Sequence, residues 1–442
     1  MILDRVFLVL LFLLGLAGFV PSGSVVSAQE GHYWTEFYGT RSTILNGIVI
    51  GSVDDLAAVY YNPARLGLID NPGVILSGKV YEWSLLEIEA ALGEGLDLSA
   101  SKFGGVPSLA AGTFRLPFLP RHHFGYAFLT RYRQSTDLFA RDLRNGDILD
   151  AFPGIETIDE KIFLATEIKE EWFGVSWSYP LSEMVSIGFT GFYADRSKKN
   201  SFDLRFTALS QGGQVAQLLR NRAIGYSANG LLGKFGFAAD LFPVTLGVTV
   251  TTPKWNFGGK GHLVYEEIFN GWDLDDDGVD EDRFETSLQK DLPSKHRWPW
   301  SVGVGAGVTH NKHLLHFSAE WFGPVSGYTL LESEEFIGQT SGDTLSFRIV
   351  DDLKSVLNFG LGYEYLFSGR YSVHTSFATD RSAVRGDVNG WVTDSGEISN
   401  STLRKDFFHF GGGASLTFDA VEFTLGATYT TAAQRFERPL DP

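Results

Sequence analysis

The stretch GSVDDLAAVYYNPARLG, from Gly51 to Gly67, decides how the rest of this chain is interpreted. It carries an acidic pair, small and apolar residues, two tyrosines and then an Asn-Pro-Ala step. Asp54 and Asp55 suit the start of a helix, because a carboxylate accepts bonds from the free backbone amides there. Asn62-Pro63 disfavours helical backbone and so ends a helix. The stretch therefore predicts a short helical turn over 56–59, closed by a tight turn.

A sequence typical of an export signal precedes this stretch. Arg5 stands before an apolar run from Val6 to Val20, and Val26-Ser27-Ala28 supplies a small-residue cleavage site before Gln29. A basic residue, an apolar core and such a site indicate a secretory signal peptide over residues 1–28, with a retained membrane anchor as the alternative. The chain has no cysteine, which rules out a lipoprotein anchor, disulfides and thiol chemistry.

A long series of alternating segments follows residue 74. Apolar or aromatic side chains occupy every second position, with glycine, serine, threonine or charged residues between them. The clearest segments are 172–179, 185–193, 302–308, 315–321, 357–365, 408–418 and 421–429. A membrane-spanning strand needs about 9–11 residues with apolar side chains outward. The part after the signal has no apolar run of about 18 residues, so a helical membrane protein is excluded.

This pattern predicts an all-β protein, a transmembrane antiparallel β-barrel, although a two-sheet sandwich would alternate as well. Tight turns are expected at Asn311-Lys312, Ser368-Gly369 and Asp419-Ala420, and long outer loops at 134–162, 196–221, 267–297 and 380–403. The residues before the first strand are rich in small side chains and suit an internal plug. The expected order is a signal at 1–28, a hatch at 29–73, the barrel at 74–436 and a tail at 437–442.

The acidic pair, the tyrosines and Asn62-Pro63-Ala64, with a barrel behind them, resemble the plug of the FadL-type (FadL/TodX-like) outer-membrane transporters. The resemblance implies a barrel of about fourteen strands in the bacterial outer membrane, with a hatch of short helices folded inside. Arg65 departs from the family, which commonly has glycine at this position. The hatch and gating residues that the resemblance implies are Gly51, Asp54, Asp55, Tyr61, Asn62, Pro63 and Ala64.

The expected function is uptake of hydrophobic small molecules, such as long-chain fatty acids or hydrocarbons, by passive diffusion past the hatch. Aromatic segments taken as loops would capture the ligand; their residues are Trp255, Phe257, Phe269, Trp272, Trp298 and Trp300. A partner-binding barrel of a secretion machinery and a general porin are the alternatives. Lipid and lipopolysaccharide would surround the barrel, and a protein partner stays open. The net charge of −17 argues against nucleic acid.

An acidic stretch near residue 275 has the spacing of a calcium loop. Alternating carboxylates wrap a hard cation, and Gly278 permits the sharp turn. The position that would close such a loop is Phe284, so a looser surface loop is expected, and a merely solvated acidic loop is the alternative. Calcium would be structural, and no cofactor is required. The candidate ligands are Asp273, Asp275, Asp277, Val279, Glu281 and Glu285.

Serines and histidines are scattered over the polar faces of the strands. A barrel hydrolase would need a serine, a histidine and an orienting carboxylate or amide within hydrogen-bond reach. Such residues are expected in any polar barrel interior, so we do not expect an enzyme. The residues concerned are His310, His316, His374, His409, Ser318, Ser372, Ser376 and Ser415.

Overall fold

The computed structural model describes residues 31–69, 73–88, 98–147, 154–272, 281–385, 396–401, 404–418 and 421–432. The predicted signal, the acidic stretch at 273–280 and the tail from residue 437 lie outside these ranges. Within them, no helix has the length and apolar character needed to cross a membrane.

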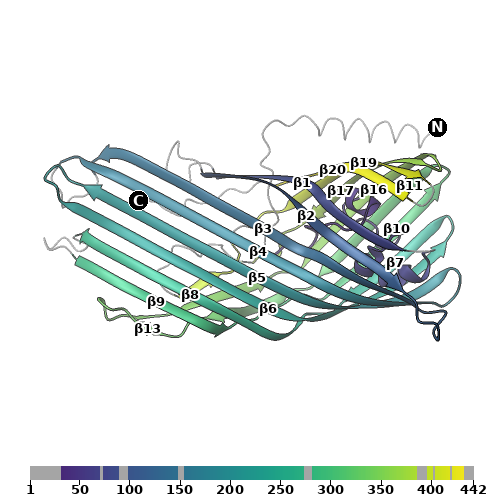
Figure 1. The fold of residues 1–442 in the computed structure, drawn as a ribbon, viewed down its shortest axis with the longest axis horizontal. Helices are drawn as coiled ribbons and strands as arrows, with labels where there is room; N and C mark the ends of the chain where they lie inside the picture. Colours follow the sequence, from purple (N-terminus) through teal and green to yellow (C-terminus); the bar gives the residue numbers. More distant parts are fainter. Residues whose placement is uncertain are drawn as a thin grey trace.

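Most described residues belong to one fifteen-stranded, antiparallel sheet that curves into a barrel wall (Figure 1). The all-β class predicted from the alternation is confirmed. The strands of this sheet are β1 (Val74–Ile88), β2 (Leu98–Phe114), β3 (His123–Gly146), β4 (Glu156–Pro180), β5 (Val185–Leu209), β6 (Val215–Leu241), β7 (Val244–Thr251), β8 (Trp255–Trp272), β9 (Glu281–Pro293), β10 (Ser301–His310), β11 (His313–Phe322), β16 (Val356–Ser368), β17 (Tyr371–Asp380), β19 (Phe407–Phe418) and β20 (Val421–Thr431).

Two positions in the wall are each filled by a pair of shorter strands. Next to β6, β7 pairs with its last residues and β8 with its first two thirds. In the following position, β10 pairs with β7 and β9 pairs with β8. Proline cannot donate to a ladder, and Pro253 and Pro299 lie in the two interruptions. The fifteen strands therefore form a path of thirteen wall positions, close to the predicted fourteen. Among described residues no pairing joins β1 to β20.

Four neighbouring strands are much longer than a membrane requires. β3 to β6 have 24, 25, 25 and 27 residues, against the roughly 10 needed to span a bilayer. With β8 and β9 they project to one side as an outer extension (Figure 1). The prediction of loops at 134–162 and 196–221 is therefore wrong for most of these residues, and the prediction at 267–297 is wrong over 267–272 and 281–293, which belong to β8 and β9. Charged and polar residues interrupt the hydrophobic alternation in the outer extension, although apolar side chains such as Ile224 and Tyr265 are buried on the inner face. Cross-strand pairs such as Arg141–Asp159 (2.8 Å) join the outer parts of the strands.

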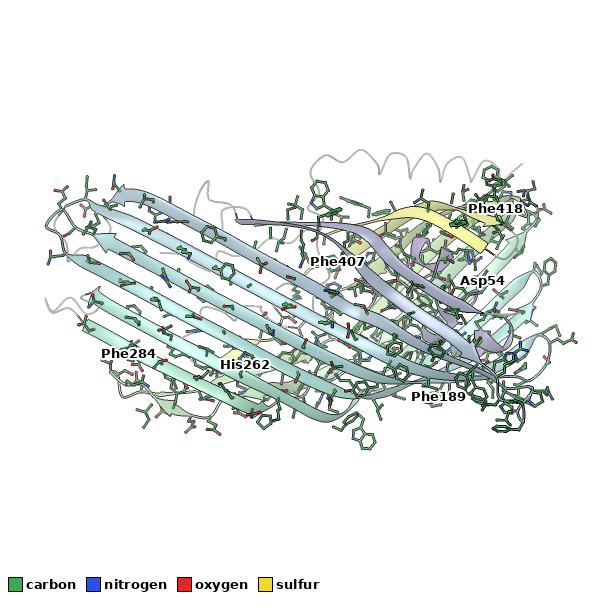
Figure 2. The ribbon with its side chains drawn as sticks, in the orientation of Figure 1. Asp54, Phe189, His262, Phe284, Phe407 and Phe418 are labelled. Atoms are coloured by element: carbon green, nitrogen blue, oxygen red, sulfur yellow. The ribbon has the colours of Figure 1, made fainter. Side chains whose placement is uncertain are left out.

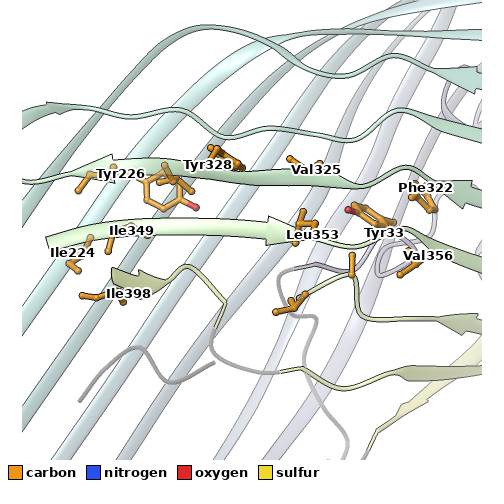
Figure 3. Packing of buried hydrophobic residues seen from close by; sticks show 14 of the residues in the cluster. Tyr33, Ile224, Tyr226, Phe322, Val325, Tyr328, Ile349, Leu353, Val356 and Ile398 are labelled. Atoms are coloured by element: carbon orange, nitrogen blue, oxygen red, sulfur yellow. The ribbon is translucent and has the colours of Figure 1, made fainter. Parts of the chain in front are cut away.

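A second, three-stranded sheet covers the inner face of this extension. It contains β12 (Val325–Glu332), β15 (Phe347–Leu353) and β18 (Gly396–Ser399), and a small hairpin of β13 (Phe336–Ile337) and β14 (Thr344–Leu345) lies beside it. Buried apolar side chains fill the space between the two layers (Figure 3). This outer core includes Tyr33, Ile224, Tyr226, Leu263, Tyr265, Leu292, Phe322, Val325, Tyr328, Leu331, Phe347, Ile349, Leu353 and Ile398.

Residues 31–69, which we call the hatch, lie at the barrel end opposite the outer extension (Figure 1). Their regular elements are short: α2 (Arg41–Ile44), α3 (Ala58–Tyr61) and the 3-10 helix η1 (Pro63–Gly67). The helix expected after Asp55 forms as α3 and ends at Asn62, whose backbone is extended. Apolar hatch residues pack on wall residues such as Leu129, Trp172 and Phe192 in a second buried cluster.

Candidate functional site

The hatch backbone rests directly on glycines of the barrel wall. A Cβ added to Gly188 would lie 2.4 Å from the carbonyl carbon of Pro63, and one on Gly236 would lie 2.2 Å from Oδ1 of Asn62. A Cβ on Gly305 would lie 2.6 Å from the amide nitrogen of Gly51. Any side chain at these wall positions would displace the hatch. The inward glycines of β5, β6 and β10 therefore set how closely the hatch approaches.

Asn62 ties the hatch to itself and to the wall. Its Nδ2 donates to the carbonyls of Ile50 (2.9 Å) and Phe237 (3.0 Å). Its Oδ1 accepts from the amide of Ala64 (3.2 Å) and so caps η1. The side chain is fully buried, so these bonds replace water for three backbone groups. The Asn-Pro-Ala step thus lies against the wall, with Pro63 and Ala64 over Gly188.

Arg65, the departure from the family pattern, has a structural role of its own. Its Nε donates to the carbonyl of Val53 (2.9 Å), and its guanidinium pairs with Asp240 at the end of β6. Ser178 donates to the carbonyl of Ala64 (3.0 Å) from β4, and Ser186 does so from β5. The base of the hatch is therefore held by strands β4, β5 and β6.

The two acidic residues of the quoted stretch have different tasks. Asp54 pairs with Arg41 at 2.8 Å and lies at the hatch end of the barrel (Figure 2). Asp55 accepts from the amides of Ala57 (2.8 Å) and Thr40 (3.2 Å), which closes the loop between α2 and α3. Burial, with the nearby charge of Asp54, raises the pKa of Asp55 to about 6.

A polar cluster on β11, β16 and β17 holds α2. Arg41 donates to Oε2 of Glu364 at 3.0 Å. The same oxygen lies 3.7 Å from Nε2 of His316 and 3.6 Å from Nδ1 of His374. His316 in turn bonds the hydroxyl of Ser52 (2.8 Å). This cluster connects the wall to the hatch through one buried carboxylate.

Two serines complete an arrangement with the order of a hydrolase triad. The hydroxyls of Ser372 and Ser415 each lie 3.0 Å from Nε2 of His374, while Glu364 faces the other ring nitrogen. A working triad needs that second contact to be a hydrogen bond, and 3.6 Å is too long for one. Glu364 is also bound by Arg41. The arrangement therefore fits a structural anchor better than a reactive triad.

An aromatic cluster lies where the hatch meets the outer core. Trp172 contacts Trp298 at 5.4 Å and Phe192 at 5.2 Å between ring centroids. Tyr33 contacts Trp298 at 5.2 Å and stacks on Phe322 at 4.1 Å. Trp298 packs against both the hatch cluster and the outer core. Aromatic and apolar side chains thus pack continuously from the outer core to the hatch, a continuity that we call the apolar path, although charged residues such as Arg131 and Lys234 lie beside it.

Two small cavities flank the aromatic cluster. The hatch-side cavity has a volume of ≈ 20 Å³ and is lined, among others, by Tyr33, Tyr60, Lys234 and Glu320. The outer cavity has a volume of ≈ 30 Å³ and is lined, among others, by Tyr33 and Trp298. Each holds about one or two water molecules. Neither of these two cavities of the described residues has room for a toluene-sized molecule, so a ligand would enter them only if side chains or the hatch moved.

The predicted capture residues do not form one site. Trp298 lines the interior, but the side chains of Trp255 and Phe257 are 75% and 57% exposed on β8. Trp300 is partly exposed and packs on Trp321 at 4.6 Å. Phe269 lies beneath Arg283, 5.9 Å from its guanidinium carbon. The side chain of Trp272 is outside the described part, and residues 255–272 form a strand where a loop was expected.

The predicted calcium ligands fall mostly outside the described residues. Of the set, Asp273, Asp275, Asp277 and Val279 are not described, and nor is the side chain of Glu281. Glu285 is buried on β9, where it accepts from the amide of Ser341 (3.0 Å). Among described residues no cluster of three or more His, Asp or Glu is arranged to hold a metal. The calcium loop stays a prediction.

Several interior residues escaped the sequence analysis. Arg131 and Tyr33 carry no recognisable motif, and Tyr60 lies in the quoted stretch but was not among the predicted hatch and gating residues. Trp172 did give a signal, because it interrupts the alternation of 172–179 with an aromatic residue on the inward side. Its burial beside Trp298 explains that interruption.

Comparison with solved structures identifies the architecture. The chain superposes on the Pseudomonas putida toluene transporter TodX with a TM-score of 0.53 at 12% identity, covering 90% of this chain and 96% of that one. It superposes on the CymD monoaromatic hydrocarbon channel with a TM-score of 0.51 at 12% identity, covering 89% and 94%. No family model and no curated protein matches the sequence. The fold implied by the resemblance of the Asn-Pro-Ala stretch is confirmed.

Proposed function

We propose that this chain is a bacterial outer-membrane channel for hydrophobic small molecules and that the hatch closes it. TodX and CymD, which share its fold, are described as a toluene transporter and a monoaromatic hydrocarbon channel. We propose the same class of ligand for this chain. Neither catalysis nor a cofactor is part of it.

One observation carries the proposal: the apolar path through the molecule. The interior of an outer-membrane barrel is ordinarily polar. Here the outer core continues through Trp298 into the hatch cluster. Moving an apolar ligand from water into such a path lowers its free energy. Ions and sugars have little apolar surface and are not stabilised in this way. This argues against a general porin.

A sideways exit at the edge of β3 is part of this proposal. β2 pairs with β3 only from Phe124 to Leu129, although β3 continues to Gly146. Within the described residues, the edge of β3 beyond this point has no pairing to β2. A ligand that leaves the path sideways at the start of this unpaired edge, next to Leu129, would enter the membrane and avoid the polar barrel end. Import by this route needs no water-filled lumen.

Uptake assays test the proposal. Cells that express the chain should take up radiolabelled toluene or palmitate faster than cells without it. A variant shortened around Asn62-Pro63 should lose gated uptake while the barrel still shows heat-modifiable migration in gels. Unchanged uptake in a correctly assembled variant would contradict hatch gating.

Mass spectrometry of the protein extracted in mild detergent separates the alternatives. Near-stoichiometric hydrophobic ligand supports the channel. A stoichiometric protein partner without lipid supports the secretion role, and uptake of small hydrophilic solutes supports a porin.

A further inference from the structure

Arg131 lies on the inward face of β3 with Ala127 and Leu129, and a β-bulge turns its neighbour Tyr132 inward as well. The register between β3 and β4 shifts between Thr130 and Tyr132, so Arg131 is the extra residue. A bulge re-aims side chains and breaks the alternation of a strand. Arg131 and Tyr132 are accordingly both buried, with 1% and 4% of their surface exposed. The bulge lies directly after the last residue of β3 that pairs with β2.

The guanidinium of Arg131 lies in a box of three aromatic rings. Its central carbon is 4.8 Å from the ring centroid of Trp298, 5.8 Å from Trp172 and 6.0 Å from Tyr60. Such faces attract a buried cation. Trp172 is fixed by a 2.7 Å bond from its Nε1 to Glu170, which pairs with Arg196 at 2.7 Å. The wall side of the box is therefore rigid.

From this box Arg131 holds the first residues of the hatch. It donates to the carbonyl of Tyr33 and to the hydroxyl of Thr35 (3.4 Å). Tyr60, the third ring of the box, also belongs to the hatch. One wall side chain thus contacts two separate hatch segments.

The box lies between the two cavities. Tyr33 lines both of them, Tyr60 lines the hatch-side cavity and Trp298 lines the outer one. A ligand that moves inward along the apolar path therefore reaches the aromatic faces that the guanidinium covers.

We propose that Arg131 is the latch of the hatch. An apolar ligand competes with the guanidinium for the aromatic box, since flat apolar groups stack on the same faces. When Arg131 leaves the box, Tyr33 and Thr35 lose their bonds and the first hatch segment is released. Arg131 is a positioning residue. The identity of the displacing ligand rests on the proposed function, whereas the contact of Arg131 with the hatch does not.

Hydrogen exchange of the amides of residues 33–37, followed by mass spectrometry in detergent, tests the latch. In R131M these amides should exchange about tenfold to a hundredfold faster than in the wild type, because charged hydrogen bonds are lost. R131K keeps the charge but loses the planar fork, and should also exchange faster. Heat-modifiable migration confirms that each variant is folded.

Arg222 provides a matched control. It is as deeply buried as Arg131, and its guanidinium lies 5.5 Å from the ring of Tyr265 and 5.4 Å from Phe347 in the outer core. R222M should leave exchange of residues 33–37 unchanged. Equal exchange in R131M and the wild type, or equal acceleration in R131M and R222M, would overturn the latch.

Saturating toluene tests the displacement. It should accelerate exchange of residues 33–37 in the wild type and add nothing in R131M; the same acceleration in both would overturn displacement. Toluene uptake by wild-type cells is measured separately. If wild-type cells do not take up toluene while R131M still exchanges faster at residues 33–37, the latch is supported and the proposed ligand is contradicted.

Discussion

At the scale of single residues, two features hold the hatch: the close approach of its backbone to wall glycines, and hydrogen bonds made by single side chains such as Asn62. Asn62 donates hydrogen bonds to two carbonyls, one of them in the wall. The wall has glycines where the hatch backbone lies against it, so no side chain keeps the two apart. The sequence predicted that Asn62-Pro63 would end a helix. It did not predict which wall residues would meet this step, because a contact between residues 63 and 188 leaves no local pattern.

Gly188→Ala should loosen the hatch. The new Cβ would overlap the backbone of Pro63 and Ala64, which cannot rotate away. Overpacking of this kind costs about 1–3 kcal/mol, measured as faster amide exchange over residues 58–66. Gly412→Ala is the control, because its Cβ would meet nothing within 4 Å. An equal effect of both substitutions would show that the contact with the wall is not responsible.

The hatch should be less stable at neutral than at acidic pH because of Asp55. Its pKa is raised from 3.8 to about 6, so protonated Asp55 favours the folded hatch. This contribution is complete below about pH 4 and is lost as the pH rises through about 6. After correction for intrinsic rates, hatch amides should exchange faster at pH 7 than at pH 4.5. Asp55→Asn should abolish that difference; if it persists, another group is responsible.

At the scale of elements, the free edge of β9 is covered by side chains. Gln339 accepts from the amide of Thr286 (2.8 Å) and donates to its carbonyl (2.9 Å). Thr340 does the same for Phe284, at 3.0 and 3.1 Å. Gln289 pairs in this way with the backbone of Glu334. Exposed strand edges invite pairing with other chains, so these bonds protect β9.

The double substitution Gln339→Ala, Thr340→Ala should expose that edge. Phe284 and Leu288 are exposed beside it, so the variant should self-associate in detergent. Light scattering would show a larger mass than for the wild type, and the Phe284 and Thr286 amides should exchange faster. Glu335→Ala, a substitution in the same exposed segment, should leave both unchanged. A monodisperse double variant with wild-type exchange would refute edge protection.

The limits of the sequence analysis are also clearest among the elements. Segments such as 302–308 and 315–321 were predicted correctly as strands because one of their faces is apolar. The outer halves of β3 to β6 were predicted as loops, since charged and polar residues there interrupt the alternation that an apolar face would give. Their pairing depends on partners up to about fifty residues away, such as Arg220 and Glu267. Charge pairs of that separation are visible only once the register is known.

At the scale of the whole molecule, two closures lie in series along one apolar path. The outer core fills the space between the extension and the three-stranded sheet, and the hatch fills the barrel end. The sequence predicted the barrel and a plug before its first strand. It did not predict the inner sheet, because β12, β15 and β18 are separated by long segments and pair partly in parallel. The central claim is that the hatch must move for a hydrophobic molecule to pass.

A reversible cross-link tests that claim most directly. The chain has no cysteine, so a single engineered pair is unambiguous. A Cβ on Gly307 would lie 2.9 Å from Cβ of Ser52, so the two positions must separate by roughly 0.6 Å to reach the 3.5–4.5 Å range of a disulfide. S52C/G307C would fasten the middle of the hatch to β10. The account predicts that oxidised protein does not take up toluene or palmitate and that reduction restores uptake. Equal uptake before and after reduction, with the cross-link verified by mass, would contradict it.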